Sequence, residues 1–282
     1  MQIVTIAKSA PSVHFCLTVN VGHNNESKET LGISSLLEKL ILKRAQGKVQ
    51  AIYGGTITSY FVEVPKEKWQ EGLQTLSAVL NDFNFSEGNI AAEKEDIIKH
   101  TVDMFPIPRR QLKLLYKHTA YANADINWDM DNYIKSVGRY TAADIQAFAG
   151  RYYVAENTIL VICGEIDNAL LLQEADKLLK GLPRGKQNPV KKDIYTGGFA
   201  QIPGKKSSLA YFGFDISHVP NIAELAVLLK LLAGRLERSF IDTDVNSDVK
   251  IAGYYGRRSL LISVESQQDN FPELLDIVAD NI

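Results

Sequence analysis

The sequence has few cysteines and no long apolar run, and both facts exclude classes of protein. Cys16 and Cys163 each lie in an apolar stretch typical of a strand, which indicates buried thiols and argues against a disulfide framework or a cysteine metal site. No stretch approaches the roughly 18 uninterrupted apolar residues of a membrane-spanning helix. The opening residues MQIVTIAKSAP also lack the basic and long apolar segments of a signal peptide. These observations predict a soluble chain.

An excess of charge of one sign is also lacking. The 31 basic and 33 acidic residues leave a net charge of -2, so nothing indicates a nucleic-acid partner or an anionic membrane surface. Glycine-rich phosphate loops, nucleophile elbows and Cys-x-x-Cys pairs are absent from the sequence as well. The compartment stays open between cytoplasm and periplasm, because a signal segment can have been removed from the chain.

Apolar periodicity predicts an α+β fold with two related subdomains, each a mainly antiparallel sheet backed by helices. The division predicted is residues 1–185 and 186–282, joined through the linker GLPRGKQNPVKKD, with the second subdomain incomplete. The final stretch FPELLDIVADNI begins a helix without a stop signal, so we expect the native chain to continue past Ile282. The expected strands cover residues 13–22, 56–64, 158–166, 197–204, 207–216 and 258–266, and the expected helices cover residues 32–43, 66–83, 90–103, 140–153, 168–182 and 221–241.

Several segments, in order, resemble one family of zinc enzymes. They are GISSLLEKLILK, the strand ending SYFVEV, the helix AAEKEDIIKHTVDM and FAGRYYVAENTILVICGEID, with Glu26 in the polar loop before the first of them. This order is similar to that of the pitrilysin/insulinase-type zinc metallopeptidases, the inverzincins, over essentially the whole chain. Gly32 resembles the glycine that enters the family's H-x-x-E-H helix.

The resemblance implies a zinc site that this sequence has lost. In active members two histidines at i and i+4 and a later glutamate bind zinc, while the glutamate at i+3 activates the zinc-bound water. The two histidine positions fall here on Ser35 and Lys39, the base on Glu38 and the distal ligand on His100. Lys39 would place an ammonium where a dication should bind. We therefore expect no bound metal and no functional catalytic residue. One hypothesis is that Lys39 replaces part of the metal's charge by pairing with a carboxylate such as Glu38, and the alternative is an ordinary solvent-exposed lysine.

A second part of the family's machinery is also eroded. An arginine and a tyrosine usually approach the substrate carbonyl from the later domain. The stretch GRLERSFIDTDVNSDVKIAGYYG keeps Arg235 and Leu236 but has Ile241 where that arginine is expected. Tyr254 and Tyr255 lie beyond the tyrosine position and are predicted strand residues.

These losses predict a non-catalytic inverzincin homologue rather than an enzyme. The resemblance implies an inactive subunit that pairs with an active zinc-bearing subunit, or with itself, to form a chamber binding extended peptides. One alternative is a zinc endopeptidase with a rearranged metal site, for example from His23, Glu38 and His100. The other is a stand-alone scaffold that binds peptides along an exposed sheet edge. His14, His118 and His218 lack ligand-spaced neighbours.

Overall fold

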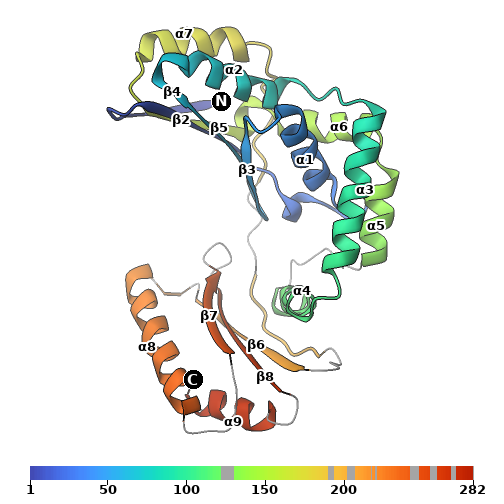
Figure 1. The fold of residues 1–282 in the computed structure, drawn as a ribbon, viewed down its shortest axis with the longest axis vertical. Helices are drawn as coiled ribbons and strands as arrows, with labels where there is room; N and C mark the ends of the chain where they lie inside the picture. Colours follow the sequence, from blue (N-terminus) through green and yellow to red (C-terminus); the bar gives the residue numbers. More distant parts are fainter. Residues whose placement is uncertain are drawn as a thin grey trace. The chain divides into compact units, whose positions relative to one another are not determined.

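The chain forms two compact units (Figure 1). Unit 1 comprises Met1–Thr101 and Trp128–Lys191, and unit 2 comprises Val102–Asn127 and Lys192–Ile282. Unit 2 therefore includes a segment from the middle of the chain. The predicted division into residues 1–185 and 186–282 has a single boundary and does not contain this segment in its second part. This computed structural model describes residues 1–121, 130–189, 194–201, 207–216, 218–219, 221–241, 248–254, 259–267 and 271–281.

Unit 1 is built on a five-stranded sheet with the strand order β1-β5-β2-β4-β3. The first strand pairs parallel to the fifth, and the other neighbours are antiparallel. Its strands are β1 (Gln2–Ala7), β2 (Ser12–Val19), β3 (Gln50–Tyr53), β4 (Thr58–Pro65) and β5 (Thr158–Gly164). Its helices are α1 (Ile33–Ala45), α2 (Trp69–Asn81), α3 (Glu87–Met104), α5 (Met130–Arg139), α6 (Ala142–Tyr152) and α7 (Asn168–Leu179).

The two faces of the unit 1 sheet differ in burial. Along β2, Phe15 and Leu17 are buried at 1% exposure on the face that α2 covers, whereas Cys16 and Thr18 on the other face are only half-buried. Alternating side chains of a strand point to opposite faces, so only the α2 side forms the core. The prediction of buried thiols is therefore wrong. Cys16 and Cys163 are free and half-buried, because they lie on the face away from that core.

A buried asparagine fixes the corner that leads into β5. The side-chain Nδ2 of Asn157 donates to the carbonyls of Tyr152, at 2.8 Å, and of Asn20, while its Oδ1 accepts from the amide of Asn188. The Tyr60 and Tyr153 hydroxyls lie 2.7 Å apart nearby. The stretch RYYVAEN thus holds a helix, a strand and a loop together through buried hydrogen bonds, which makes its role structural.

Unit 2 repeats part of this plan. Its elements are α4 (Pro108–Ala120), β6 (Ser207–Asp215), α8 (Ile222–Ile241), β7 (Asp248–Tyr254), β8 (Ser259–Gln267) and α9 (Phe271–Asn281). The strand order β6-β8-β7, with α8 between β6 and β7 and α9 after β8, matches β2-β4-β3 with α1 and α2 in unit 1. A core containing Leu236, Ile262 and Leu274 joins the sheet to its two helices. Two related α+β subdomains are therefore present.

The structure confirms most of the predicted elements and corrects one. Residues 197–201 of the expected strand GGFAQIPG are not a strand, because Gly197 and Gly198 have φ of 68° and 136° and Phe199 is 90% exposed. Residues 202–204 lie outside the described part. Pro108 follows the end of α3 and is also the first residue of the helix α4, a position that favours proline. In the part of the chain that is described, no helix combines the length and apolar character needed to cross a membrane.

Candidate functional site

The helix α1 begins at a glycine that no other residue could easily replace. Gly32 caps the helix with φ of 80°, in the left-handed region. A Cβ at this position would lie 2.7 Å from Cγ2 of Val137 and 2.8 Å from Cε2 of Tyr133, both on α5. The Tyr140 hydroxyl donates to the carbonyl of Leu31 at 2.8 Å, which fixes the chain just before the glycine. The start of α1 is therefore set by backbone conformation and by contact with α5.

A buried carboxylate caps α1 from a distance. Glu26, at 4% exposure, accepts hydrogen bonds from the amides of Gly32 at 2.8 Å and Ser34 at 3.0 Å, and also from the Ser34 hydroxyl. The Ser34 hydroxyl lies 2.9 Å from that of Tyr53. Burial raises the pKa of Glu26 to about 7, and its hydrogen bonds oppose this rise only in part. Glu26 satisfies amides that a helix start leaves without partners, so its first role is structural.

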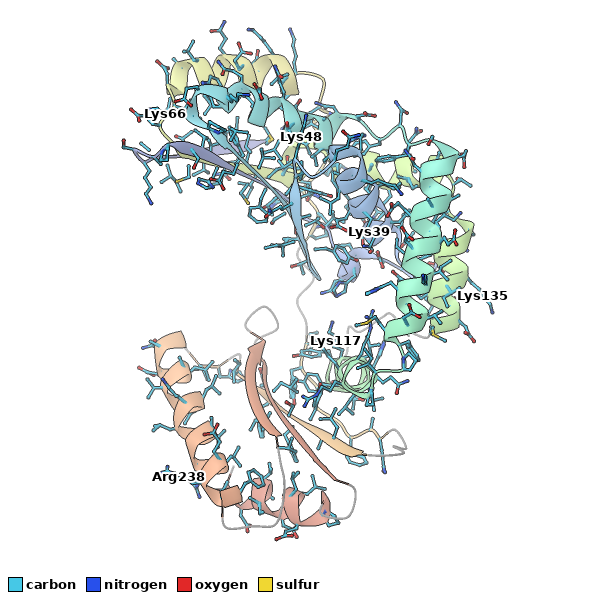
Figure 2. The ribbon with its side chains drawn as sticks, in the orientation of Figure 1. Lys39, Lys48, Lys66, Lys117, Lys135 and Arg238 are labelled. Atoms are coloured by element: carbon cyan, nitrogen blue, oxygen red, sulfur yellow. The ribbon has the colours of Figure 1, made fainter. Side chains whose placement is uncertain are left out.

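The three degenerate positions on α1 have different environments. Ser35 is half-buried and Glu38 is buried at 8% exposure. Lys39, which is labelled in Figure 2, is exposed. Burial raises the pKa of Glu38, while the charge of Lys39 lowers it and that of Glu93 raises it. Lys39 acts on Glu38 through space, and no ion pair joins Lys39 to a carboxylate among the described residues.

The partner of α1 on α3 is a glutamate rather than the expected histidine. Nζ of Lys43 lies 2.6 Å from Oε1 of Glu93, whose side chain is 10% exposed. His100, two turns further along α3, is exposed. The cation that reaches a carboxylate is therefore Lys43, one turn beyond Lys39.

This set of residues does not fit a catalytic zinc ion. Such a site normally needs about three nitrogen, sulfur or carboxylate ligands from the protein. The positions on α1 supply a hydroxyl and an exposed ammonium. Within the described ranges, no three histidine, cysteine, aspartate or glutamate side chains form a group that could hold a metal, and His23, Glu38 and His100 form no such group. The ring of His23 instead packs edge-on against Tyr53, with centroids 5.8 Å apart.

The residues of the eroded second element lie in unit 2. Arg235 and Leu236 are on α8, where Leu236 is fully buried and Arg235 donates to Oδ1 of Asn281 at 2.9 Å. Ile241 is the last residue of α8, and Tyr254 ends β7, as predicted for a strand residue. Tyr255 lies outside the described residues.

Two buried carboxylates, Glu93 and Glu26, make contacts with α1 that the sequence analysis did not predict. Glu93 shares the buried face of α3 with Ile90, Ile97 and Thr101. A glutamate in the phase of an apolar stripe is the signal that could have identified it. No sequence pattern indicated the role of Glu26. It lies in a loop, six and eight residues before its partners Gly32 and Ser34, so no helical or strand periodicity relates them.

Family models match both halves of the chain. Residues 2–125 match the model described as Insulinase (Peptidase family M16), and residues 139–282 match the model described as Peptidase M16 inactive domain. The chain belongs to peptidase family M16. The first match includes α1, and the second includes the β-α-β-β-α unit that is repeated in unit 2.

Individual relatives have low sequence identity to this chain, but the alignments cover most of it. An uncharacterized zinc protease of Rickettsia bellii is 22% identical over 230 residues, covering 76% of this chain and 56% of the relative. Cytochrome b-c1 complex subunit 1 of Saccharomyces cerevisiae is 24% identical over 206 residues, covering 67% of this chain and 45% of that protein. The solved structure of a peptidase M16 inactive domain from Pseudomonas fluorescens aligns with a TM-score of 0.76 at 15% identity, covering 99% of this chain and 76% of that one. The chain spans about half the length of these curated relatives.

Proposed function

We propose that this chain is a non-catalytic M16 subunit that pairs with an active, zinc-bearing M16 subunit and helps to hold extended peptides. The observation that carries the proposal is the donor set on α1, where Ser35 and Lys39 occupy the positions that the resemblance assigns to zinc ligands. The match of residues 139–282 to an inactive domain supports it. One matched relative is by name a subunit of a larger complex, which favours an assembled state.

The peptide-holding part rests on a free sheet edge. The strand β3 lies at one end of the strand order, and within the described part of the chain it pairs only with β4. Ile52 on β3 is 65% exposed. An edge strand presents unpaired backbone groups, to which an extended peptide can add as a further strand.

Metal content tests the non-catalytic part. The purified chain is loaded with zinc, desalted and analysed for elemental zinc. We expect far less than one zinc per chain and no chelator-sensitive peptidase activity. A tightly held ion at about one per chain, together with activity that Glu38→Gln abolishes, would establish a zinc endopeptidase with a rearranged site instead.

Co-expression tests the pairing. The chain and a zinc-bearing M16 subunit are separated by size-exclusion chromatography alone and together, and peptide cleavage is measured in each case. We expect a joint peak and cleavage that depends on both chains. Ala51→Pro should weaken peptide binding by the pair, because in the register of β3 with β4 the amide of Ala51 faces the free edge. Ile57→Pro in the loop before β4 serves as an exposed control outside the strand. Peptide binding by the isolated chain without any pairing would favour a stand-alone scaffold.

A further inference from the structure

The loop before α1 holds the turn that follows the edge strand β3. The backbone amides of His23 and Asn24 donate to the carbonyls of Gly54 and Gly55 in this turn, at 3.3 and 2.8 Å. The two segments lie so close together that a Cβ on Gly22 would collide with the carbonyl of Gly54. A movement of the loop away from the protein therefore releases the turn that ends β3.

A chain of hydroxyl groups joins the same loop to β3 itself. Glu26 accepts a hydrogen bond from the Ser34 hydroxyl, which lies 2.9 Å from the hydroxyl of Tyr53, the last residue of β3. The other oxygen of the carboxylate accepts from the amide of Gly32 at 2.8 Å. Glu26 thus connects the loop to the start of α1 and, through Ser34, to β3.

No positive charge balances this buried carboxylate among the described residues. Burial raises the pKa of Glu26, and only its hydrogen bonds with Ser34 and Gly32 oppose the rise. The titratable groups around it are Tyr53 on β3, Tyr133 on α5, Tyr140 after α5, Glu38 on α1 and His23 in the loop. Arg139, the cation of this region, acts on Tyr140 and donates to the carbonyl of Glu29. Ionisation of Glu26 therefore costs free energy in the buried site, and exposure of the loop to water relieves that cost.

We propose that residues 22–26 are a pH-sensitive latch on the end of β3, which is closed while Glu26 holds its proton and opens when Glu26 ionises. In the open state the carboxylate reaches water, the turn after β3 is released and Tyr53 loses its link to Ser34. Because β3 is the strand assigned above to extended peptides, the latch would control peptide binding, and only this consequence rests on the proposed function.

Amide hydrogen exchange of the full chain, followed by NMR from pH 4.5 to above pH 7, measures the opening. The amides to follow are those of Asn24 and Ser34, whose hydrogen bonds the latch makes. After correction for intrinsic exchange, their opening constant should rise by as much as about 300-fold over this range, because Glu26 has a pKa of about 7 when closed and near 4.5 when exposed. Low urea concentrations should hardly change these rates, since a local opening exposes little surface, whereas amides of β2 should respond strongly.

Glu26→Gln and His23→Gln separate the two titratable side chains of the latch. Glutamine at position 26 does not ionise, so the exchange of Asn24 and Ser34 should lose its pH dependence. His23→Gln is the matched control, because it removes the other group that titrates near neutral pH, and it should keep the pH dependence. Circular dichroism verifies the fold of both variants. Latch amides that respond to urea as β2 does, or a pH dependence that survives Glu26→Gln, overturn the proposal.

Exchange in the presence of peptide tests the link to the proposed function. A peptide that adds to β3 binds only the closed latch. In the co-expressed pair, a blocked peptide of Val, Thr and Ser at about ten times its dissociation constant should therefore slow exchange of the Asn24 amide by about tenfold. Bound peptide without slower exchange would overturn control of β3 by the latch. A pair that binds no peptide would refute the proposed function, while exchange in the isolated chain still decides whether the latch exists.

Discussion

Lys43 on α1 and Glu93 on α3 form a hydrogen-bonded ion pair with Nζ and Oε1 2.6 Å apart. The lysine is partly exposed and the glutamate is nearly buried, so the pair brings a charge to the buried face of α3, which Ile90, Ile97 and Thr101 otherwise form. It lies next to Glu38, whose pKa Glu93 helps to raise. The two helices that would frame a metal in the resembling enzymes are thus joined here by an ion pair.

Removing the lysine of this pair should destabilise the fold more than removing Lys39. Lys43→Met leaves the nearly buried Glu93 side chain without its partner, whereas Lys39→Met removes an exposed charge. We expect a lower thermal midpoint for Lys43→Met and little change for Lys39→Met. Adding Glu93→Gln to Lys43→Met should recover part of the loss. Equal midpoints for the two single variants would contradict an energetic role for the pair.

Glu26 should make stability depend on pH in a definite direction. Its pKa is about 7 in the folded protein against an ordinary value of 4.5, so the folded state holds the proton more tightly than the unfolded state does. The resulting stabilisation is complete below pH 4.5 and is lost as the pH rises to about 7. The loss amounts to roughly 3 kcal/mol, at about 1.4 kcal/mol per pKa unit.

Urea unfolding at several pH values measures this effect, with Glu26→Gln as the comparison. Glutamine fills the same space and does not titrate. The free energy of unfolding of the native chain should fall relative to that of Glu26→Gln between pH 4.5 and about 7. Parallel pH profiles for the two proteins would show that Glu26 does not hold its proton in the folded state.

Gly32→Ala should cost about 2–4 kcal/mol of unfolding free energy, because it combines a left-handed backbone with contact between the new methyl group and α5. Gly47 offers a matched control just past the other end of α1. It has φ of 82°, but nothing lies within 4 Å of the Cβ position. Gly47→Ala should therefore cost only the backbone part, about 1–2 kcal/mol. Similar losses at both glycines would mean that α5 yields to the methyl group without cost.

Periodicity predicted the elements of this fold that carry their own pattern. The alternation of β2 and the capping threonine of α6 are local signals, and Thr141 does accept a hydrogen bond from the amide of Asp144. The strands β1 and β3 and the helices α4 and α5 were missed. The four residues of β3 are too few for a pattern, and α5 is mostly polar along its sequence MDNYIKSVGR. These elements depend on tertiary partners that a local window does not contain.

The candidate site was predictable to the same extent as the fold: local positions could be assigned from the sequence, and contacts between helices could not. The resemblance assigned the eroded positions to Ser35, Glu38 and Lys39, which lie four residues or fewer apart on one helix after a glycine. It did not identify Lys43 as the cation that meets a carboxylate, since Lys43 and Glu93 are 50 residues apart. Contacts between helices depend on how the helices pack, which the sequence order alone does not specify.

If the correspondence on α1 holds, two substitutions should restore metal affinity. Ser35→His with Lys39→His places two imidazoles at i and i+4 on one helical face and removes the ammonium charge. The resemblance implies His100 on α3 as the third ligand, and Glu93, the α3 side chain that meets α1 in this structure, offers a carboxylate. We expect this variant to retain about one zinc per chain after desalting and to gain thermal stability when zinc is added, because the metal binds only the folded state. Ser35→His with Lys39→Met is the control, since it removes the same charge but supplies one imidazole, and it should retain no zinc. The double-histidine variant could instead bind no zinc while circular dichroism shows an intact fold. That outcome would show that α3 brings no ligand within reach of these positions, and it would contradict the assignment of His100 as the distal ligand.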